Sequence, residues 1–429
     1  MIKIPSAHRF PRLLPPTAYN PAARLQTDLA SVPMGLRFTE WLLLGSLVVA
    51  YLFCISMPVF GVPLQVTSLR HFPLILLALA VTLNAFGMLL NSYPAYFSSI
   101  WSACWPLMLM AIYVTCGSLF GKYIYDTRDS FLTFGLYLFL FPAVAAVPAL
   151  SGNPNRWVWA TAFLWVTAAL AALAGAAARL PATQSLHEIE YLMMSAFVLM
   201  WFLAKSKPVK LVALLLMFAA AGLNHKLTGY IVLILALLYI VFETGWRRVD
   251  VNWRGFYIIT TFLTFSLVMV ALTIGYFQFQ SVLPTGSPEV RLNQYTEALK
   301  QFVASPIWGS AYTESSGEDF RESTRLYNIP THSDVLDMLK HGGLIAFGLF
   351  AWGYWKIFSL YTKAIAATTD DRIMRAYFVS MRFFQISALV TFSLNPLLLK
   401  GPYLLAIWGN LGLASGLALM QLRHAGRKP

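Results

Sequence analysis

Long apolar segments recur from one end of this chain to the other, and they constrain its fold more than any other feature. A helix that crosses a lipid bilayer needs about 20 mostly apolar residues, and about twelve segments approach this requirement. The expected spans are 41–60, 73–90, 101–120, 131–150, 157–178, 191–204, 209–223, 228–242, 256–277, 344–360, 376–394 and 403–422. The chain is therefore predicted to be an all-α polytopic membrane protein.

The composition supports this class. Of 429 residues, 58% are hydrophobic and only 11% are charged, whereas about 25% of an average soluble domain is charged. A chain this apolar cannot cover itself with polar surface, so lipid must serve as its solvent. The net charge of +13 fits either the cytoplasmic bias of Lys and Arg or an anionic substrate or headgroup. The cysteines show no spacing typical of a metal site or a disulfide framework.

Basic residues in the short loops predict the orientation. With the N-terminus in the cytoplasm, the cytoplasmic loops hold clusters such as Lys205, Lys207 and Lys210, and the opposite short loops are less basic. Residues 1–40 are then a basic cytoplasmic tail without the pattern of a signal peptide. We expect transmembrane helices over 41–277, one large external loop over 278–341, helices over 342–422 and a cytoplasmic tail over 423–429.

The external loop is long, and long loops in compact proteins are usually functional. Its first part, SPEVRLNQYTEALKQF, predicts an amphipathic helix with Ser287 as N-cap and Pro288 at the first helical position. This helix would lie on the bilayer surface or against the bundle. Pro306 and Gly309 would end it. The apolar positions at helical spacing are Leu292, Tyr295, Leu299 and Phe302.

The segment NIPTHSDVLDMLKHGGL ends the loop and begins the next span. Pro330 is expected to end any secondary structure that precedes it. Thr331 can cap the following helix, and Asp334, three residues later, resembles the acidic member of a capping box. Asp334 and Asp337 would also complement the positive end of the helix dipole.

His332 stands at the start of this predicted helix, at the membrane–water boundary. It falls on one helical face with Leu336, Leu339 and Gly343, so we expect it to face the bundle with the leucines. A neutral imidazole can accept a proton from an attacking hydroxyl near neutral pH. The plain alternative is a solvated loop histidine.

Several cations are expected on the same side of the membrane as His332. Arg291 lies in the amphipathic helix, and His225 and Lys226 lie in GLNHKLTG at the outer end of the seventh span. Guanidinium offers two parallel donors to phosphate oxygens, and lysine offers a point charge. The plain alternative for Lys226 is a snorkelling side chain. Further candidate substrate contacts are Arg179, Arg321 and Arg325.

Two segments of the loop resemble the O-antigen ligase and O-antigen polymerase superfamily. RLNQYTEALKQFVASPIWGSAY is similar to the family segment Arg-x-x-x-aromatic…Pro-x-x-Gly, and HSDVLDMLKHGGLIAFG is similar to its His-(Ser/Asn)-x-x-Leu…Gly segment. Their order and their place in one external loop between late spans also fit. The family usually carries Ser-Arg where this chain has His225 and Lys226, so the charge is kept and the guanidinium fork is lost.

The resemblance implies a fold and a reaction. Members transfer a glycan from a polyprenyl diphosphate carrier to an acceptor hydroxyl on the periplasmic side, without a metal, on a helical fold related to the C-type glycosyltransferases. By resemblance, His332 is the general base and Arg291 a diphosphate ligand, with no metal or other cofactor. The implied location is the bacterial inner membrane, with both termini cytoplasmic.

The implied partners are an undecaprenyl diphosphate-linked oligosaccharide donor, a glycan acceptor and membrane lipids. A chain-length regulator or other polysaccharide-assembly proteins could join them, whereas no nucleic acid is expected.

Four functions are weighed. We favour a polymerase that joins lipid-linked repeat units of a surface polysaccharide or exopolysaccharide, with inversion at the anomeric carbon. The alternative within the class is a ligase that moves glycan onto a lipid A core. A flippase or transporter would need ionisable residues inside the bundle, where Arg382 is the clearest expected case. A non-catalytic scaffold would tolerate substitution of Arg291 and His332.

Overall fold

The computed structural model describes residues 34–56, 59, 94–121, 127–150, 154–178, 186, 188–224, 227–246, 253, 260, 287–313, 317–322, 325–330, 333–395, 397 and 401–426. Only the backbone is described for 34–39, 94–97, 127–128, 149–150, 227, 287–293, 317–322, 325–330 and 424. The helices are α2 (Met34–Cys54), α5 (Pro94–Phe120), α6 (Thr127–Leu150), α7 (Pro154–Ala178), α8 (Glu190–Leu203), α9 (Lys207–Asn224), α10 (Leu227–Trp246), α12 (Ser287–Ala304), α13 (Asp334–Ala367), α14 (Arg372–Leu394) and α15 (Gly401–His424).

The predicted membrane spans coincide with helices wherever the chain is described. Among the described residues, 8 helices are long and apolar enough to cross a membrane, and two shorter apolar helices cover Glu40–Cys54 and Glu190–Leu203. The expected span 73–90 lies outside the described residues, and only residue 260 of the expected span 256–277 is described. The class of an all-α polytopic membrane protein is thus confirmed, while the full count of spans stays a prediction.

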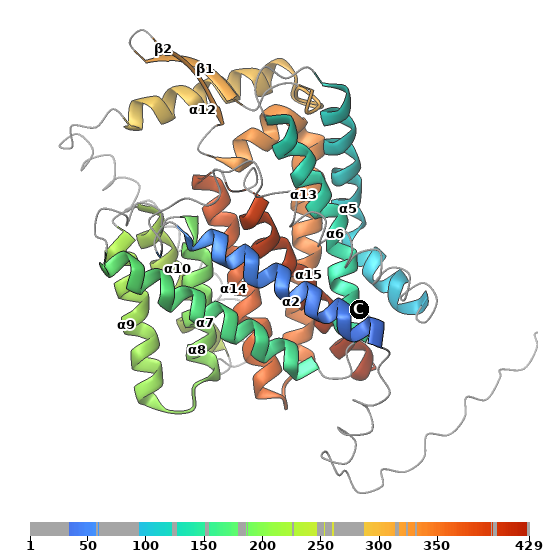
Figure 1. Cartoon of the computed structure of the whole chain (residues 1–429), viewed down its shortest axis with the longest axis vertical. Helices are drawn as coiled ribbons and strands as arrows, with labels where there is room; N and C mark the ends of the chain where they lie inside the picture. The colour runs from blue at the N-terminus through green and yellow to red at the C-terminus, as the bar shows by residue number, and fades with distance from the viewer. Residues whose placement is uncertain are drawn as a thin grey trace, which may run out of the picture.

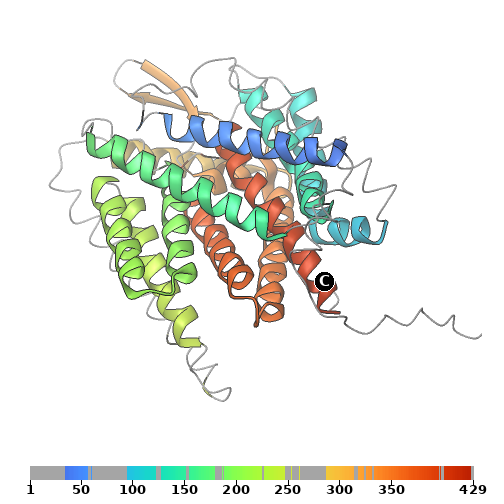
Figure 2. The same ribbon diagram turned by 60° about the horizontal axis from the view of Figure 1, so that its bottom comes forward.

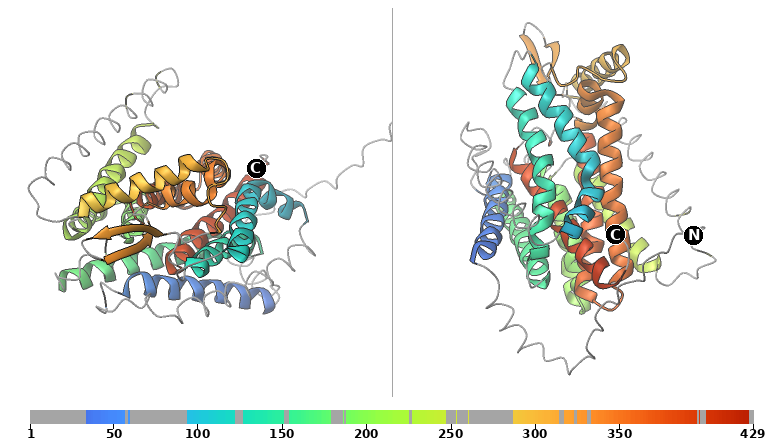
Figure 3. Two further views of the ribbon diagram at one scale, coloured as in Figure 1. Left: turned by 90° about the horizontal axis from the view of Figure 1, so that it is seen from above. Right: turned by 90° about the vertical axis from the view of Figure 1, so that its right-hand side faces the viewer.

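The helices stand as a bundle, and α12 lies across one end of it (Figure 1). Seen from above and from the side, α12 and a short β-hairpin cover this end (Figure 3). α2 and α7 lie side by side across one face of the bundle (Figure 2). We call the end that carries α12 the loop end, and the other the opposite end. α13 begins at the loop end and runs the length of the bundle.

Close packing of α15 against α6 fixes the centre of the bundle. A Cβ at Gly416 would overlap the carbonyl oxygen of Ala145, and a Cβ at Gly412 would lie 3.0 Å from a methyl of Val144. Small residues four positions apart let two membrane helices approach backbone to backbone. α15 is buried along nearly its whole length as a result.

α12 confirms the helix that was predicted in the external loop, but its buried face is different. The helix includes Ser287 as its first residue, one position earlier than expected. Among its side chains from Gln294 onward, Gln294 and Ala298 are buried, whereas Leu299 is 46% exposed. α12 packs against α13, and the larger apolar side chain of Leu299 is left outward, as in helices that rest on a bilayer surface.

The segment between α12 and α13 contains a hairpin that was not predicted. Strand β1 (Gly317–Glu322) pairs antiparallel with β2 (Arg325–Pro330), with Gly317 opposite Pro330. Charged and small residues fill much of these strands, and such residues are depleted in sheets, which hid the signal. β2 ends at Pro330, as the proline predicted.

Candidate active site at the loop end

The predicted site residues lie outside the described side chains, so their roles stay predictions. The backbone of Arg291 lies in α12, and those of Arg321 and Arg325 lie in β1 and β2. The remaining predicted residues lie outside the described part of the chain altogether: His332, Lys226, His225 and Arg179. The described residues around these positions nevertheless define the frame of the site.

Backbone hydrogen bonds join the segment after α12 to α13. The N–H of Tyr312 donates to the carbonyl of His341 at 2.9 Å, and the N–H of Leu344 donates to the carbonyl of Pro306 at 2.8 Å. Two similar bonds link Ser310 with Lys340 and Ile345 with Ile307. The two segments that resemble the superfamily therefore contact each other directly, although the hairpin separates them in the sequence.

Two glycines make this contact possible. α13 kinks at Gly343, which has a φ of 58°, and Gly309 has the same φ. A Cβ at Gly343 would overlap the backbone of Ile307, and one at Gly309 would overlap the carbonyl of Lys340. Only glycine adopts this left-handed conformation without strain and leaves room for a second backbone. The kink also presents the N–H of Leu344 to the neighbouring segment.

Aromatic side chains clamp the same segment onto α5 and α6. The ring of Tyr312 is buried, with the rings of Phe131 and Tyr113 edge-on at 5.1 and 5.8 Å. The hydroxyl of Tyr113 donates to the carbonyl of Trp308 at 2.7 Å. Burial raises the pKa of Tyr312 far above its usual value, so its hydroxyl stays protonated at physiological pH. The clamp holds the Pro-x-x-Gly segment rigidly.

A second histidine belongs to this end of the molecule, and no role for it was predicted. The ring of His341 is fully buried, its Nδ1 lies 2.9 Å from the hydroxyl of Ser310, and it packs on Phe131 at 5.1 Å. Its place in the sequence, one helical turn before an apolar run, gave no signal that would separate it from a solvated histidine. Its contacts mark it as a structural link between the two segments.

The start of α13 corrects two predictions. The N-cap is Ser333, whose hydroxyl accepts from the N–H of Leu336 at 3.4 Å, so the cap predicted at Thr331 is wrong. Asp334 accepts from the N–H of Leu397 at 2.7 Å, which ties the α14–α15 connection to α13 in place of a capping box. Asp334 and Asp337 do lie in the first turn, as the dipole argument predicted.

In the first turns of α13, the polar side of the helix faces the interior of the bundle. The buried side chains here include Asp334, Asp337 and Lys340. Leu336 and Leu339, which were predicted to face the bundle, are only partly buried. Charged groups are rarely buried unless they are paired. The side of α13 that is buried here is therefore set by polar surroundings at the loop end and not by the spacing of the leucines.

A buried carboxyl and amide meet where α8, α9 and α10 come together. Glu190 and Asn224 are 0% and 1% exposed. A Cβ at Gly229 would lie 2.6 Å from the amide nitrogen of Asn224 and 3.0 Å from an oxygen of Glu190. Neither side chain has a hydrogen-bond partner among the described residues. Buried polar groups are normally paired, and Asn224 directly precedes His225 and Lys226 in the sequence. No signal in the sequence pointed to Glu190.

Arg382, the clearest ionisable residue expected inside the bundle, is engaged in a buried ion pair. Its guanidinium contacts the carboxylate of Glu243 and donates to the Tyr239 hydroxyl at 3.1 Å. Its carbon Cζ also lies 5.7 Å from the ring centre of Phe358. Pairing of this kind satisfies a charge that would otherwise be costly in a membrane. The residue therefore ties α14 to α10.

The fold defines an integral membrane protein in which backbone hydrogen bonds join two segments at one end of a helical bundle. The family model described as O-antigen ligase matches residues 212–351, which run from α9 to beyond the kink in α13. The match covers about a third of the chain. It confirms the resemblance to the O-antigen ligase and O-antigen polymerase superfamily. No curated protein matches the chain in sequence.

Proposed function

We propose that this protein is a glycosyltransferase that joins lipid-linked oligosaccharide repeat units at the loop end. The family match supports a ligase- or polymerase-type function in general. The observation that carries the proposal further is the direct hydrogen bonding between the Pro306–Tyr312 segment and α13. It supports a site that draws on α12 and on the start of α13, the elements that carry or adjoin Arg291 and His332.

The proposed step is a single displacement at the anomeric carbon of the donor glycan. The acceptor hydroxyl oxygen forms a new bond to that carbon while the bond to the diphosphate oxygen breaks, so the configuration inverts. His332 takes the proton of the acceptor hydroxyl, a role that contributes about 10²–10⁴-fold to a rate. The electron pair leaves with the polyprenyl diphosphate.

The proposed leaving group is a diphosphate, whose developing charge fixed cations can stabilise. Preorganised charges of this kind usually supply the largest catalytic contribution. Arg291 would bind the diphosphate through two parallel N–H donors, with Lys226 as an additional charge. His225, Arg179, Arg321 and Arg325 would contact the rest of the substrate. The step then needs no metal or other cofactor, because the imidazole and the cations supply the base and the charge.

The proposed setting follows from the carrier lipid. Undecaprenyl diphosphate-linked oligosaccharide is presented on the periplasmic side of a bacterial inner membrane, so the loop end faces the periplasm and both termini face the cytoplasm. The bundle is then a relative of the C-type glycosyltransferase fold. Proteins that regulate chain length are candidate partners at the same face, and membrane lipids surround the bundle.

Reconstitution with a defined donor tests the function. The purified protein in liposomes is supplied with lipid-linked repeat units alone, and products are resolved by size. A polymerase extends the glycan, and release of free polyprenyl diphosphate accompanies each addition. No extension and no release would contradict the proposal. Arg291→Ala should weaken donor binding in the same assay, and unchanged donor affinity would remove the diphosphate role.

A ligase is the second candidate, because the matching family model is described as O-antigen ligase. A ligase would leave lipid-linked repeat units unextended when they are supplied alone. It would transfer them only when a lipid A core acceptor is added. The two functions are therefore separated by one addition to the same assay.

A further inference from the structure

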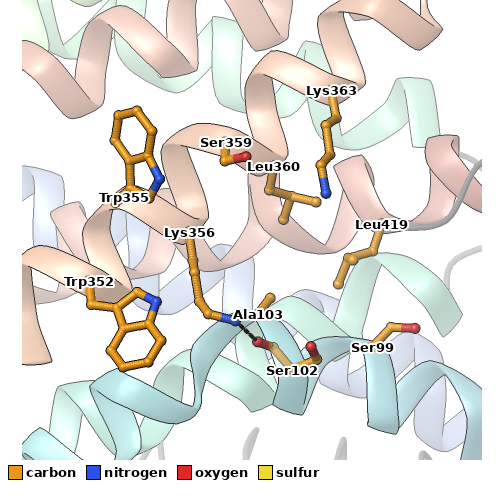
Figure 4. A pocket seen from close by; sticks show the side chains of 10 residues that line it. All are labelled: Ser99, Ser102, Ala103, Trp352, Trp355, Lys356, Ser359, Leu360, Lys363 and Leu419. Atoms are coloured by element: carbon orange, nitrogen blue, oxygen red, sulfur yellow. Dashed lines mark hydrogen bonds between the residues drawn. The ribbon is translucent and has the colours of Figure 1, made fainter.

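A cavity between α5 and α13 lies in the opposite-end half of the bundle. Its volume is about 280 Å³, and its wall is completed by Leu419 of α15. Figure 4 shows Ser99 and Ser102 on one side of it, and Lys356 and Lys363 on the other. This cavity is far from the loop-end frame along α13, so it belongs to a different part of the molecule.

The charge of the cavity is unbalanced. Among the described residues that line it, the two charged ones are both lysines and none is acidic. The ammonium of Lys356 donates to the carbonyl of Ser102 at 2.7 Å, which uses one of its three donors. Lys363 is exposed and has no ion pair among the described residues. Two like charges beside hydroxyl groups favour an anion with several acceptor oxygens.

The lysines are not explained by the C-terminal end of α13. Cations stabilise a helix end only within its last turn, and neither lysine lies in the last turn of α13. Both lysines instead lie on the side of α13 that faces α5, where Lys356 lies 6.0 Å from the ring centre of Trp105. Their common direction points to a shared ligand.

The depth of the cavity fits the headgroup region of one leaflet. At about 1.5 Å per residue, Lys356 lies about 20 Å and Lys363 about 30 Å along α13 from the kink at Gly343. The hydrocarbon core of a bilayer is about 30 Å thick, so Lys363 reaches the boundary of the leaflet opposite the loop end. Trp352 and Trp355 are 50% and 65% exposed beside the cavity; at about 13 and 18 Å from the kink on the same scale, their rings lie at the depth of the lipid chains.

We propose that an anionic phospholipid of this leaflet binds here, with its phosphate between Lys356 and Lys363. The serine hydroxyls on α5 face the headgroup, and the acyl chains run past Trp352 and Trp355 toward the membrane centre. The occupant is a lipid rather than a soluble phosphate because the cavity opens onto an apolar, tryptophan-rich flank. This site is separate from glycan transfer and does not depend on it.

Native mass spectrometry of the full chain in a neutral detergent tests the proposal. Phosphatidylglycerol is titrated in one arm and phosphatidylcholine in the other. We expect phosphatidylglycerol to be retained and phosphatidylcholine to be lost. In K356Q/K363Q the Kd for phosphatidylglycerol should rise roughly tenfold or more. Equal retention of both lipids, or an unchanged Kd in this variant, would overturn the site.

The matched control changes two lysines elsewhere on the opposite end. Lys205, in the connection between α8 and α9, and Lys207, the first residue of α9, are both exposed. K205Q/K207Q therefore removes the same charge without touching the cavity and should bind as the unchanged protein does. K356R/K363R guards against misfolding, because it should keep most of the binding. A third arm adds glycerol 3-phosphate, which should not displace the lipid; displacement at equal concentration would show that a soluble phosphate suffices and would contradict the proposal.

Discussion

Charged side chains are held differently at the two ends of the bundle. At the loop end, charged and polar side chains such as Asp334 and Lys340 point inward, and backbone hydrogen bonds hold the segments that carry them. At the opposite end, Lys356 and Lys363 line an open cavity, and Arg382 is held by Glu243 through side chains alone. The loop end therefore depends on backbone geometry, and the opposite end depends on side-chain pairing.

This difference indicates which end of the bundle can hold a precisely arranged catalytic site. Catalysis requires groups that are fixed before the substrate arrives, and backbone bonds between Tyr312 and His341 or Leu344 and Pro306 supply that rigidity. Flexible lysines around an open cavity can bind a ligand that is recognised by its negative charge and by its depth in the membrane. Substitutions at the two ends should therefore have different effects on activity and stability.

The largest effect is expected at the loop end, where two histidines can be compared. His332→Ala should lower the rate of glycan transfer by about 10²–10⁴-fold because it removes the proposed base. His341→Ala should instead lower the thermal unfolding temperature, because it removes the contact with Ser310 and the packing on Phe131. The measurements are product release in liposomes and thermal unfolding in detergent. Near-normal transfer by His332→Ala would remove the base assignment.

The bundle was largely predictable from the sequence, because bilayer thickness sets the length of an apolar helix. The resemblance predicted that the two loop segments lie in one external loop, but their direct backbone contact was not predicted. What could not be predicted depends on distant partners. Asp334 bonds to Leu397, 63 positions away, so its own neighbourhood suggested a local capping box. The hairpin was hidden by charged residues that strands usually avoid.

The second largest effect is expected at the opposite end. Arg382→Met should destabilise the protein by about 3–5 kcal/mol, because it leaves the carboxylate of Glu243 buried without its cation. The double variant Arg382→Met/Glu243→Gln also removes the unpaired carboxylate and should recover much of the lost stability. Denaturation in mixed detergent measures both. If the single and double variants were equally unstable, side-chain pairing would not be what holds this end.

Gly343→Ala tests the backbone geometry of the loop end. Gly343 has a φ of 58° and a ψ of −160°, a region that is essentially restricted to glycine, so alanine there costs about 1–3 kcal/mol. The added Cβ would also overlap Ile307. We expect a lower unfolding temperature and a loss of transfer together, since the kink positions both loop segments. Gly348→Ala is the control, because a Cβ there meets nothing within 4 Å. Equal behaviour of the two variants would show that the kink is dispensable.

The smallest effects are expected from the helix caps, one at each end. Asp371 caps α14 at the opposite end, and its carboxylate accepts from the N–H groups of Ile373 and Met374, both at 3.0 Å. Ser333 caps α13 at the loop end through one longer bond of 3.4 Å. Removing a cap costs about 0.5–2 kcal/mol, so Asp371→Ala should fall near the top of this range and Ser333→Ala near the bottom. The exposed neighbour Asp370 makes no cap bond, so Asp370→Ala sets the baseline. A larger loss for Ser333→Ala than for Asp371→Ala would mean that side chains, and not only backbone bonds, hold the loop end.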